Sequence, residues 1–281
     1  MMKKIWIILL IALTVASCTE RIDIELDETY TRLVVYGTIT TDTTSHHVKL
    51  TSTTSYYYNE APPPVTGASV EITDNEGNLF TLNETEPGIY TTSQDFAAIP
   101  GRTYTLFIEL EEEINGNKTY TASSTVSPIN QIDSIGLVSR PDWGEQGFYE
   151  VTCYYQDPPT QDFYMFNLYK NGELLTDTIN DKFVSEDSFY NGNYTNGIGI
   201  GYLDQSNERE VLHPGDTIIF QGANISEDYY DFVVALQSET GFQTPLFSGP
   251  PANVKGNINN GAVGFFAAYS VAYSSKVFET E

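Results

Sequence analysis

Short runs of alternating apolar and polar residues, separated about every ten residues by turn-forming residues, are the feature that most constrains this fold. In the run 104–110 every second residue is Tyr, Leu or Ile, as expected for a strand with one buried face. The segments 74–78, 86–88 and 99–101 carry the Asp, Asn, Pro and Gly that reverse a chain. Twenty Tyr and 15 Phe beside three Met also favour strands. The pattern predicts a mostly β, β-sandwich-like protein with strands near 33–40, 48–53, 68–73, 79–82, 104–110, 119–126, 148–156, 163–170, 173–178, 217–221 and 261–278.

A second module is expected after residues 127–130, because Pro128 ends one strand series and a new apolar series begins at Ile132. We therefore predict two β-sandwich-like modules, residues 32–127 and 128–281. In the second module Asn171-Gly172 is a strong two-residue hairpin signal. Residues 181–201, rich in Asn, Gly and Asp, are expected to be a loop that either meets cargo or covers the mouth of a receptor barrel.

One amphipathic helix is expected in the second module. Ser226 is a suitable N-cap, and apolar residues then recur at spacings of three and four. Gly241 is expected to supply a left-handed stop. Leu236 belongs to the apolar set, which should pack on the sheet.

The first 17 residues have the pattern of a secretory signal peptide. Lys3 and Lys4 precede an apolar run of eleven residues, 5–15, which is too short to span a bilayer. The sequence Val-Ala-Ser-Cys at 15–18 resembles a bacterial lipobox, in which the Cys18 thiol receives a diacylglyceryl group. An ordinary signal peptide with a chance Cys18 is the alternative. We expect residues 1–17 to be removed and residues 18–31 to form a lipidated tether.

The chain is strongly acidic, with 13 Lys and Arg against 38 Asp and Glu. A nucleic-acid partner is therefore not expected, since such affinity depends on basic residues. Without residues 1–17 the net charge would be −27, so acyl chains on Cys18 rather than basic residues should hold the protein on outer-membrane lipid. Cys153 is the remaining cysteine, expected to be a buried thiol on a strand face with Tyr149, Val151 and Tyr155.

The lipobox occurs together with PPVTGASV at 63–70, PGRTYTL at 100–106, GPPANVKGNI at 249–258 and GFFAAYS at 264–270. With these motifs the chain resembles the uncharacterised Bacteroidota lipoproteins of domain of unknown function 4249. The resemblance implies an outer-membrane accessory of a TonB-dependent receptor, facing either the cell surface or the periplasm, with no established ligand, cofactor or catalytic residues to carry over. The first module also looks like a prealbumin/Ig-like module. The acidic stretch after Cys18 is similar to a surface-export signal, although Thr19-Glu20-Arg21 interrupts it.

No phosphate loop, nucleophile elbow, zinc-protease or EF-hand motif is present, so we expect no enzyme and no metal. His46 and His47 are adjacent, point to opposite sides of a strand, and are interpreted as a solvated pair. The pair Asp187 and Asp204 is a weak candidate for glycoside hydrolysis. A calcium site is the other alternative, and its candidate oxygen donors are Asp181, Glu186, Asp187, Asn191 and Asn193.

Tyr56, Tyr57 and Tyr58 are the candidate ligand-binding residues. Three consecutive aromatic residues in a strand cannot all face the core, and exposed Tyr is a rigid platform for sugars, peptides or proteins. A Tyr-rich edge strand is the alternative. The leading hypothesis is a lipid-anchored protein that binds a TonB-dependent receptor, its glycan or peptide cargo, or both. An adhesion or structural lipoprotein and a calcium-assisted hydrolase of glycans or peptides are the alternatives.

Overall fold

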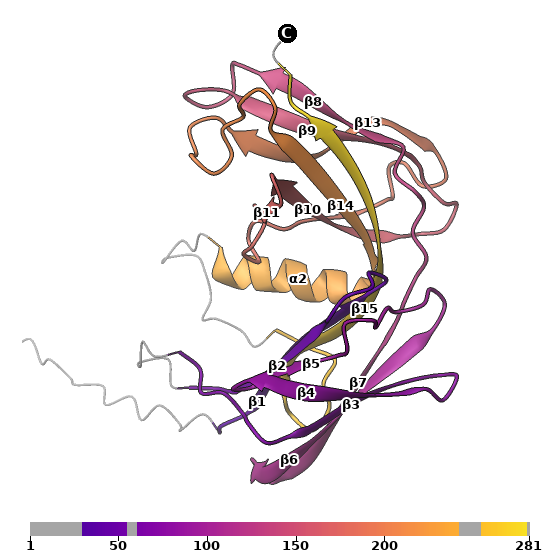
Figure 1. The fold of residues 1–281 in the computed structure, drawn as a ribbon, viewed down its shortest axis with the longest axis vertical. Coiled ribbons are helices and arrows are strands. Elements are labelled where there is room, and N and C mark those ends of the chain that lie inside the picture. The colour runs from indigo at the N-terminus through magenta and orange to yellow at the C-terminus, as the bar shows by residue number, and fades with distance from the viewer. Residues whose placement is uncertain (1–29, 55–60, 242–253, 280–281) are drawn as a thin grey trace, which may run out of the picture. The chain divides into compact units, whose positions relative to one another are not determined.

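The last strand, β15 (Val263–Val277), joins the two halves of the fold. It runs parallel to β1 (Leu33–Thr40) along its first half and antiparallel to β14 (Thr217–Ile225) along its second. Figure 1 shows this strand passing through the computed structural model, which describes residues 30–54, 61–241 and 254–279.

The strands of the described residues form two sheets. The larger has twelve strands in the order β11-β10-β14-β15-β1-β2-β5-β4-β3-β6-β7, with β12 paired to β10, and the smaller has the order β13-β9-β8. Their bounds are β2 (His47–Ser52), β3 (Ser69–Asp74), β4 (Leu79–Glu86), β5 (Ile89–Thr91), β6 (Thr103–Ile114), β7 (Asn117–Thr125), β8 (Ser134–Arg140), β9 (Phe148–Gln156), β10 (Phe163–Lys170), β11 (Glu173–Leu174), β12 (Phe183–Glu186) and β13 (Tyr194–Asp204).

Three apolar clusters hold these layers together. The first fills the space among β1 to β7 and includes Leu50 and Leu106, with Phe266 from β15. The second lies between the three-stranded sheet and β10, β14 and β15, and includes Val151 and Phe220. The third packs the helix α2 (Glu227–Thr240) on the opposite face of β10, β14 and β15. The mostly β, sandwich-like fold class is therefore confirmed.

Helix α2 forms where the sequence predicts it. The Ser226 side chain accepts a hydrogen bond from Tyr229 N, which satisfies one of the free amides of the first turn. Phe232 and Val233 are buried, and Leu236 is partly buried against the third cluster. The predicted left-handed stop is wrong, because Gly241 is extended at φ −71° and its amide bonds to Gln237 O.

Most strand predictions agree with the structure, and the runs 33–40, 148–156 and 163–170 coincide with β1, β9 and β10. The β10–β11 hairpin turns through Asn171 and Gly172 at φ 51° and 87°, both left-handed. Positive φ at Gly88 and Gly101 accompanies two further predicted reversals.

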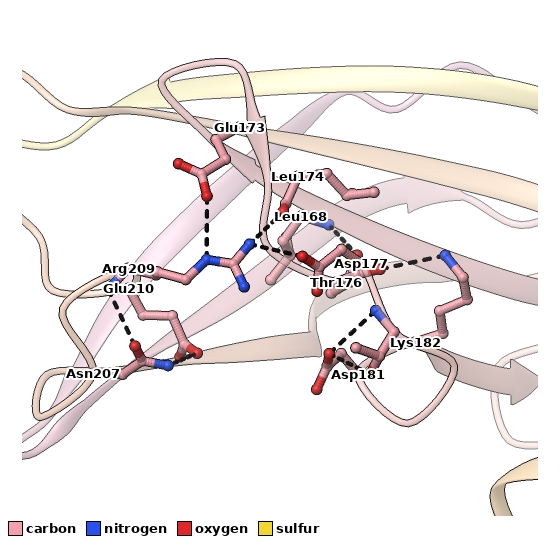
Figure 2. A network of polar contacts seen from close by, with 11 residues as sticks. Leu168, Glu173, Leu174, Thr176, Asp177, Asp181, Lys182, Asn207, Arg209 and Glu210 are labelled. Atoms are coloured by element: carbon pink, nitrogen blue, oxygen red, sulfur yellow. Dashed lines mark hydrogen bonds and ion pairs between the residues drawn. The ribbon is translucent and has the colours of Figure 1, made fainter. Parts of the chain in front are cut away.

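The predicted strand 173–178 is wrong beyond Leu174. Residues after Leu174 are held by side chains, because the Thr176 hydroxyl accepts from Leu168 N at 3.3 Å. Figure 2 shows the Arg209 guanidinium bonded to the carboxylates of Glu173 and Asp177 and to Leu174 O, at 3.0–3.1 Å. These contacts fix the segment without a strand ladder.

The predicted loop 181–201 is also wrong. It contains β12 and most of β13, which pair with β10 and β9. Glycines lower the strand propensity of β13, and the pairing is interrupted by register shifts at 196/198 and 199/201. The connection between the two strands, 187–193, is the irregular part that remains.

Residues Thr31–Glu281 form one compact unit. The division between residues 127 and 128 separates the first two apolar clusters along the chain, except that residues 258–268 return to the first cluster. The two-module organisation therefore stays a prediction. Among the described residues, none of the helical structure is long and apolar enough to cross a bilayer.

Candidate functional site

The residues first expected to carry function are Cys18 and the Tyr56–Tyr57–Tyr58 run. All four lie outside the residues that the structure describes. The roles predicted for them, lipid attachment and ligand binding, therefore stay predictions.

Cys153 is a core residue, as expected. It is 1% exposed and packs in the second apolar cluster with Val151 and Tyr155. Burial raises the pKa of the Cys153 thiol to about 12, so the nucleophilic thiolate is scarce at neutral pH.

The interpretation of His46 and His47 as a solvated pair is wrong for one of them. His46 is 6% exposed and lies edge-on to Phe96, with ring centroids 5.5 Å apart. Burial lowers the pKa of His46 and favours its neutral form. His47 is exposed at the start of β2, so the two rings have different surroundings.

The acidic candidates are not brought together. Asp204 accepts from Ser206, whereas Asp187 is fully buried and accepts from Asp162 N at 2.9 Å. Among the proposed calcium donors, Asp181 bonds to Thr178. Within the described part of the chain, no three His, Cys, Asp or Glu side chains are grouped so that they could hold a metal ion.

Asp187 belongs instead to a buried group with Asp157 and Asp162. Asp157 Oδ1 accepts from the Tyr164 hydroxyl at 2.8 Å, and Asp162 Oδ1 accepts from Asn224 Nδ2 at 2.8 Å. Asp187 Oδ1 has no hydrogen-bond partner. Burial is the main cause that raises the pKa of Asp157 and of Asp187, which favours protonated carboxyls.

A different surface gathers exposed aromatic rings and polar groups. It is the outer face of the three-stranded sheet, the small sheet β13-β9-β8 in Figure 1, on the side away from the second apolar cluster. We call it the aromatic face. It is formed by Arg140, Trp143, Glu150, Thr152, Tyr154, Tyr194, Asn196 and Tyr202.

One end of the aromatic face is built around an ion pair. Arg140 Nε donates to Glu150 Oε2 at 2.9 Å, and the guanidinium carbon lies 5.5 Å from the centroid of the Trp143 ring. Tyr202 is opposite Glu150 in the strand register, and its ring centroid is 5.5 Å from that of Trp143. Trp143 and Tyr202 are each 45% exposed, so both rings present area to solvent.

Glycines make room for the central groups of this face. A Cβ on Gly136 would lie 2.5 Å from Thr152 Oγ1, and a Cβ on Gly199 would lie 2.5 Å from Glu150 Oε1. The Tyr154 ring covers Gly197, whose Cβ would approach its hydroxyl to 2.8 Å. The strands on both sides of β9 therefore leave room for its side chains, and Thr152 Oγ1 is buried without a hydrogen-bond partner.

The other end of the aromatic face carries two more tyrosines. Asn196 is opposite Tyr154, and Tyr194 is 48% exposed. A hydrogen bond between the Tyr194 hydroxyl and Asp133 is the main cause that raises the pKa of Tyr194. From the Tyr202–Glu150 row to the Asn196–Tyr154 row the face extends roughly 13 Å along β9.

Sequence reasoning missed this face because its residues are far apart in the chain. The alternation of β9 was visible, and it places Glu150, Thr152 and Tyr154 opposite the core residues. The aromatic partners come from β13, which was expected to be a loop, and from the β8–β9 connection. Recognising 194–204 as a strand would have revealed the face.

A family model described as "Domain of unknown function (DUF4249)" matches residues 19–275. Among curated proteins none matches. A solved structure titled "Ca2+-stabilized adhesin helps an Antarctic bacterium reach out and bind ice" is similar at 14% identity with a TM-score of 0.24. That similarity covers 70% of this chain and 45% of the other, so the chain spans less than half of the adhesin structure.

Proposed function

We propose, from the premise that the chain belongs to this family of unknown function, that it is a non-enzymatic, lipid-anchored binding protein of the outer membrane. In this proposal acyl chains on Cys18 hold it at the surface. It assists a TonB-dependent receptor by binding the receptor, its cargo, or both.

The observation that supports binding most is the aromatic face. Trp143, Tyr194 and Tyr202 are 45–48% exposed on a sheet whose other face is a packed core. Exposed rings held by a rigid layer lose little entropy when a partner covers them. Such a surface is suited to binding, and the buried Cys153 is not suited to nucleophilic catalysis.

The anchor proposal rests on the sequence at 15–18 and on charge. A chain with 38 acidic and 13 basic residues is repelled by anionic headgroups. Stable attachment then requires several acyl chains, since each buried methylene contributes about 0.8 kcal/mol.

The test is purification of the tagged full chain from native outer membranes in mild detergent, followed by mass spectrometry. We expect a TonB-dependent receptor to be enriched with the wild-type chain. Cys18→Ala should lose palmitate labelling, leave the membrane fraction and lose the receptor. A wild-type chain that reaches the outer membrane without such a receptor would contradict the proposal and favour an adhesion or structural role.

A further inference from the structure

We infer that the aromatic face binds a neutral glycan, with sugar rings lying on Trp143 and Tyr202 and hydroxyls bonded to the Arg140–Glu150 pair. This inference rests on the proposed function, because it names the cargo of that binding protein. It assigns a ligand class to a surface defined by the contacts among Arg140, Trp143, Glu150 and Tyr202.

The shape of the face fits a saccharide. A pyranose ring has a broad C–H surface, which packs well on an aromatic plane, and a rim of hydroxyls that each donate and accept. Trp143 and Tyr202 supply two half-exposed planes with centroids 5.5 Å apart. The 54° tilt between them makes a shallow angle rather than one flat stack, so each plane can receive its own sugar ring.

The polar groups of the face match neighbouring hydroxyls. The Glu150 carboxylate accepts and the Arg140 guanidinium donates, and each has hydrogen-bonding capacity beyond their mutual bond. The Arg140 side chain is 41% exposed, so solvent-side donors are accessible. Gly199 leaves room beside the Glu150 carboxylate, because a Cβ there would lie 2.5 Å from Oε1, and the Glu150 side chain is 13% exposed.

Charge selects a neutral ligand. Arg140 and Glu150 neutralise each other, while the rest of the chain gives a formal net charge of −25. An anionic glycan or nucleic acid would be repelled by this field and would find the one guanidinium of the face already paired. A neutral glycan meets neither cost.

A peptide fits this face less well. Peptides that recognise sheets usually add a strand at an open edge, and β9, the centre of this face, is paired on both sides by β8 and β13. A protein interface of ordinary kind would place apolar groups at its centre. Here the centre holds Thr152 and glycines, and the ion pair and the exposed rings lie toward the ends.

Tryptophan fluorescence can test binding at this site alone. The chain has two Trp, and Trp6 lies in residues 1–17, which we expect to be removed, so in the mature protein the signal comes from Trp143. The purified protein in detergent is titrated with neutral gluco-, manno- and galacto-oligosaccharides, with polygalacturonate as the anionic probe and an unstructured neutral peptide mixture as the third. We expect a saturable change in Trp143 emission with at least one neutral oligosaccharide and none with polygalacturonate or the peptides.

Two variants separate the site from the rest of the surface. Tyr202→Ala should weaken the neutral oligosaccharide about tenfold or more while leaving the melting temperature within a few degrees. Phe189→Ala, which removes an aromatic side chain 97% exposed elsewhere, should leave affinity unchanged. Glu150→Gln keeps the shape of the side chain and should weaken binding with little effect on stability.

The inference is overturned if no neutral oligosaccharide changes Trp143 emission, if polygalacturonate or the peptides bind more tightly, or if Tyr202→Ala and Phe189→Ala weaken binding equally. Receptor enrichment from native membranes is measured on the same wild-type protein. Enrichment without glycan binding removes this inference and leaves the proposed function standing. Glycan binding without a receptor contradicts the receptor partnership alone.

Discussion

The two faces of β9 have opposite chemistry although they alternate residue by residue. Val151, Cys153 and Tyr155 on the inner face are 0–6% exposed and pack in the second apolar cluster. On the outer face Glu150 is paired with Arg140, and the Tyr154 ring lies over glycines. The inner face is part of the apolar core. The outer face is a surface whose shape depends on glycines in the neighbouring strands, which leave room for the side chains of β9.

Acidic groups differ in the same way between core and surface. Glu150 has a guanidinium partner. Within the described part of the chain, the buried carboxyls of Asp157, Asp162 and Asp187 accept hydrogen bonds from neutral hydroxyl and amide groups only. A buried carboxylate without a cation is costly. The comparison therefore predicts that changes to buried groups alter stability, whereas changes to the exposed groups of the outer face alter binding.

The largest expected effect is from a charge on the inner face. Val151→Asp would bury a carboxylate at a position with 0% exposure, and we expect a loss of about 4 kcal/mol or more in the free energy of unfolding. The neighbouring Glu150→Gln removes only a partly exposed ion pair and should cost about 0–1 kcal/mol. Chemical denaturation of both variants measures the difference. Similar losses in the two variants would show that the inner and outer faces of β9 do not differ in their contribution to stability.

The inner face was predictable from the sequence, and the outer face was not. Alternating apolar residues at 149–155 identified the buried side, since burial leaves a period-two signal. The same rule located β1, and the capping residue Ser226 located the start of α2. Both signals need only the local order of residues.

The outer face depends on contacts between distant segments. Gly136 and Gly199 are read locally as loop residues, but each leaves room for a side chain of β9. Leu174 ends β11 because Thr176 and Arg209 make side-chain contacts that periodicity does not encode. The buried state of His46 likewise depends on Phe96, 50 residues later in the chain.

The next effect tests whether the glycines shape the outer face. Gly136→Ala in β8 places a Cβ 2.5 Å from Thr152 Oγ1 of the central strand β9. We expect a loss of about 1–3 kcal/mol in the free energy of unfolding. Gly136 does not have a left-handed φ, so the cost comes from the clash rather than from the backbone. In a Thr152→Ala background the same substitution should cost less than about 1 kcal/mol. Equal costs in the two backgrounds would exclude the clash as the cause.

A smaller effect is expected from the buried acids as pH changes. The pKa of Asp187 is raised by burial above its ordinary 3.8, so the folded state binds this proton more tightly than the unfolded state. Its contribution is fully present below about pH 3.8 and is lost as pH rises through the folded pKa. Asp187→Asn should therefore gain a few degrees in melting temperature, relative to wild type, between pH 4 and pH 7.

Asp74 is a control, because its contribution to stability should change with pH in the opposite direction to that of Asp187. Hydrogen bonds from Asn78 and Arg102 lower the pKa of Asp74 to about 2, although burial opposes them. Its stabilising contribution is present above pH 3.8 and is lost as pH falls toward 2. Asp74→Asn should therefore be most destabilised, relative to wild type, near neutral pH. If the melting temperatures of Asp187→Asn and wild type instead changed in parallel with pH, Asp187 would not be the group that titrates.

The smallest expected effect concerns the Thr152 hydroxyl at the centre of the aromatic face. Thr152 is 4% exposed and its Oγ1 has no hydrogen-bond partner, so the folded state bears a desolvation cost that water relieves in the unfolded state. Thr152→Val replaces this hydroxyl by a methyl group on a side chain that keeps its strand preference. We expect a gain of less than about 1 kcal/mol in the free energy of unfolding, measured by denaturation.

Thr152→Val also tests whether the exposed groups of the aromatic face, rather than the buried hydroxyl, bind the oligosaccharide. Because Thr152 Oγ1 is covered, its removal should leave the oligosaccharide affinity of the mature protein unchanged, unlike Tyr202→Ala. A loss of stability in Thr152→Val would mean that the hydroxyl is hydrogen-bonded in solution. A loss of affinity at unchanged stability would place this hydroxyl among the groups that contact the ligand, and would extend the binding surface from the aromatic rings into the glycine-lined centre of the sheet.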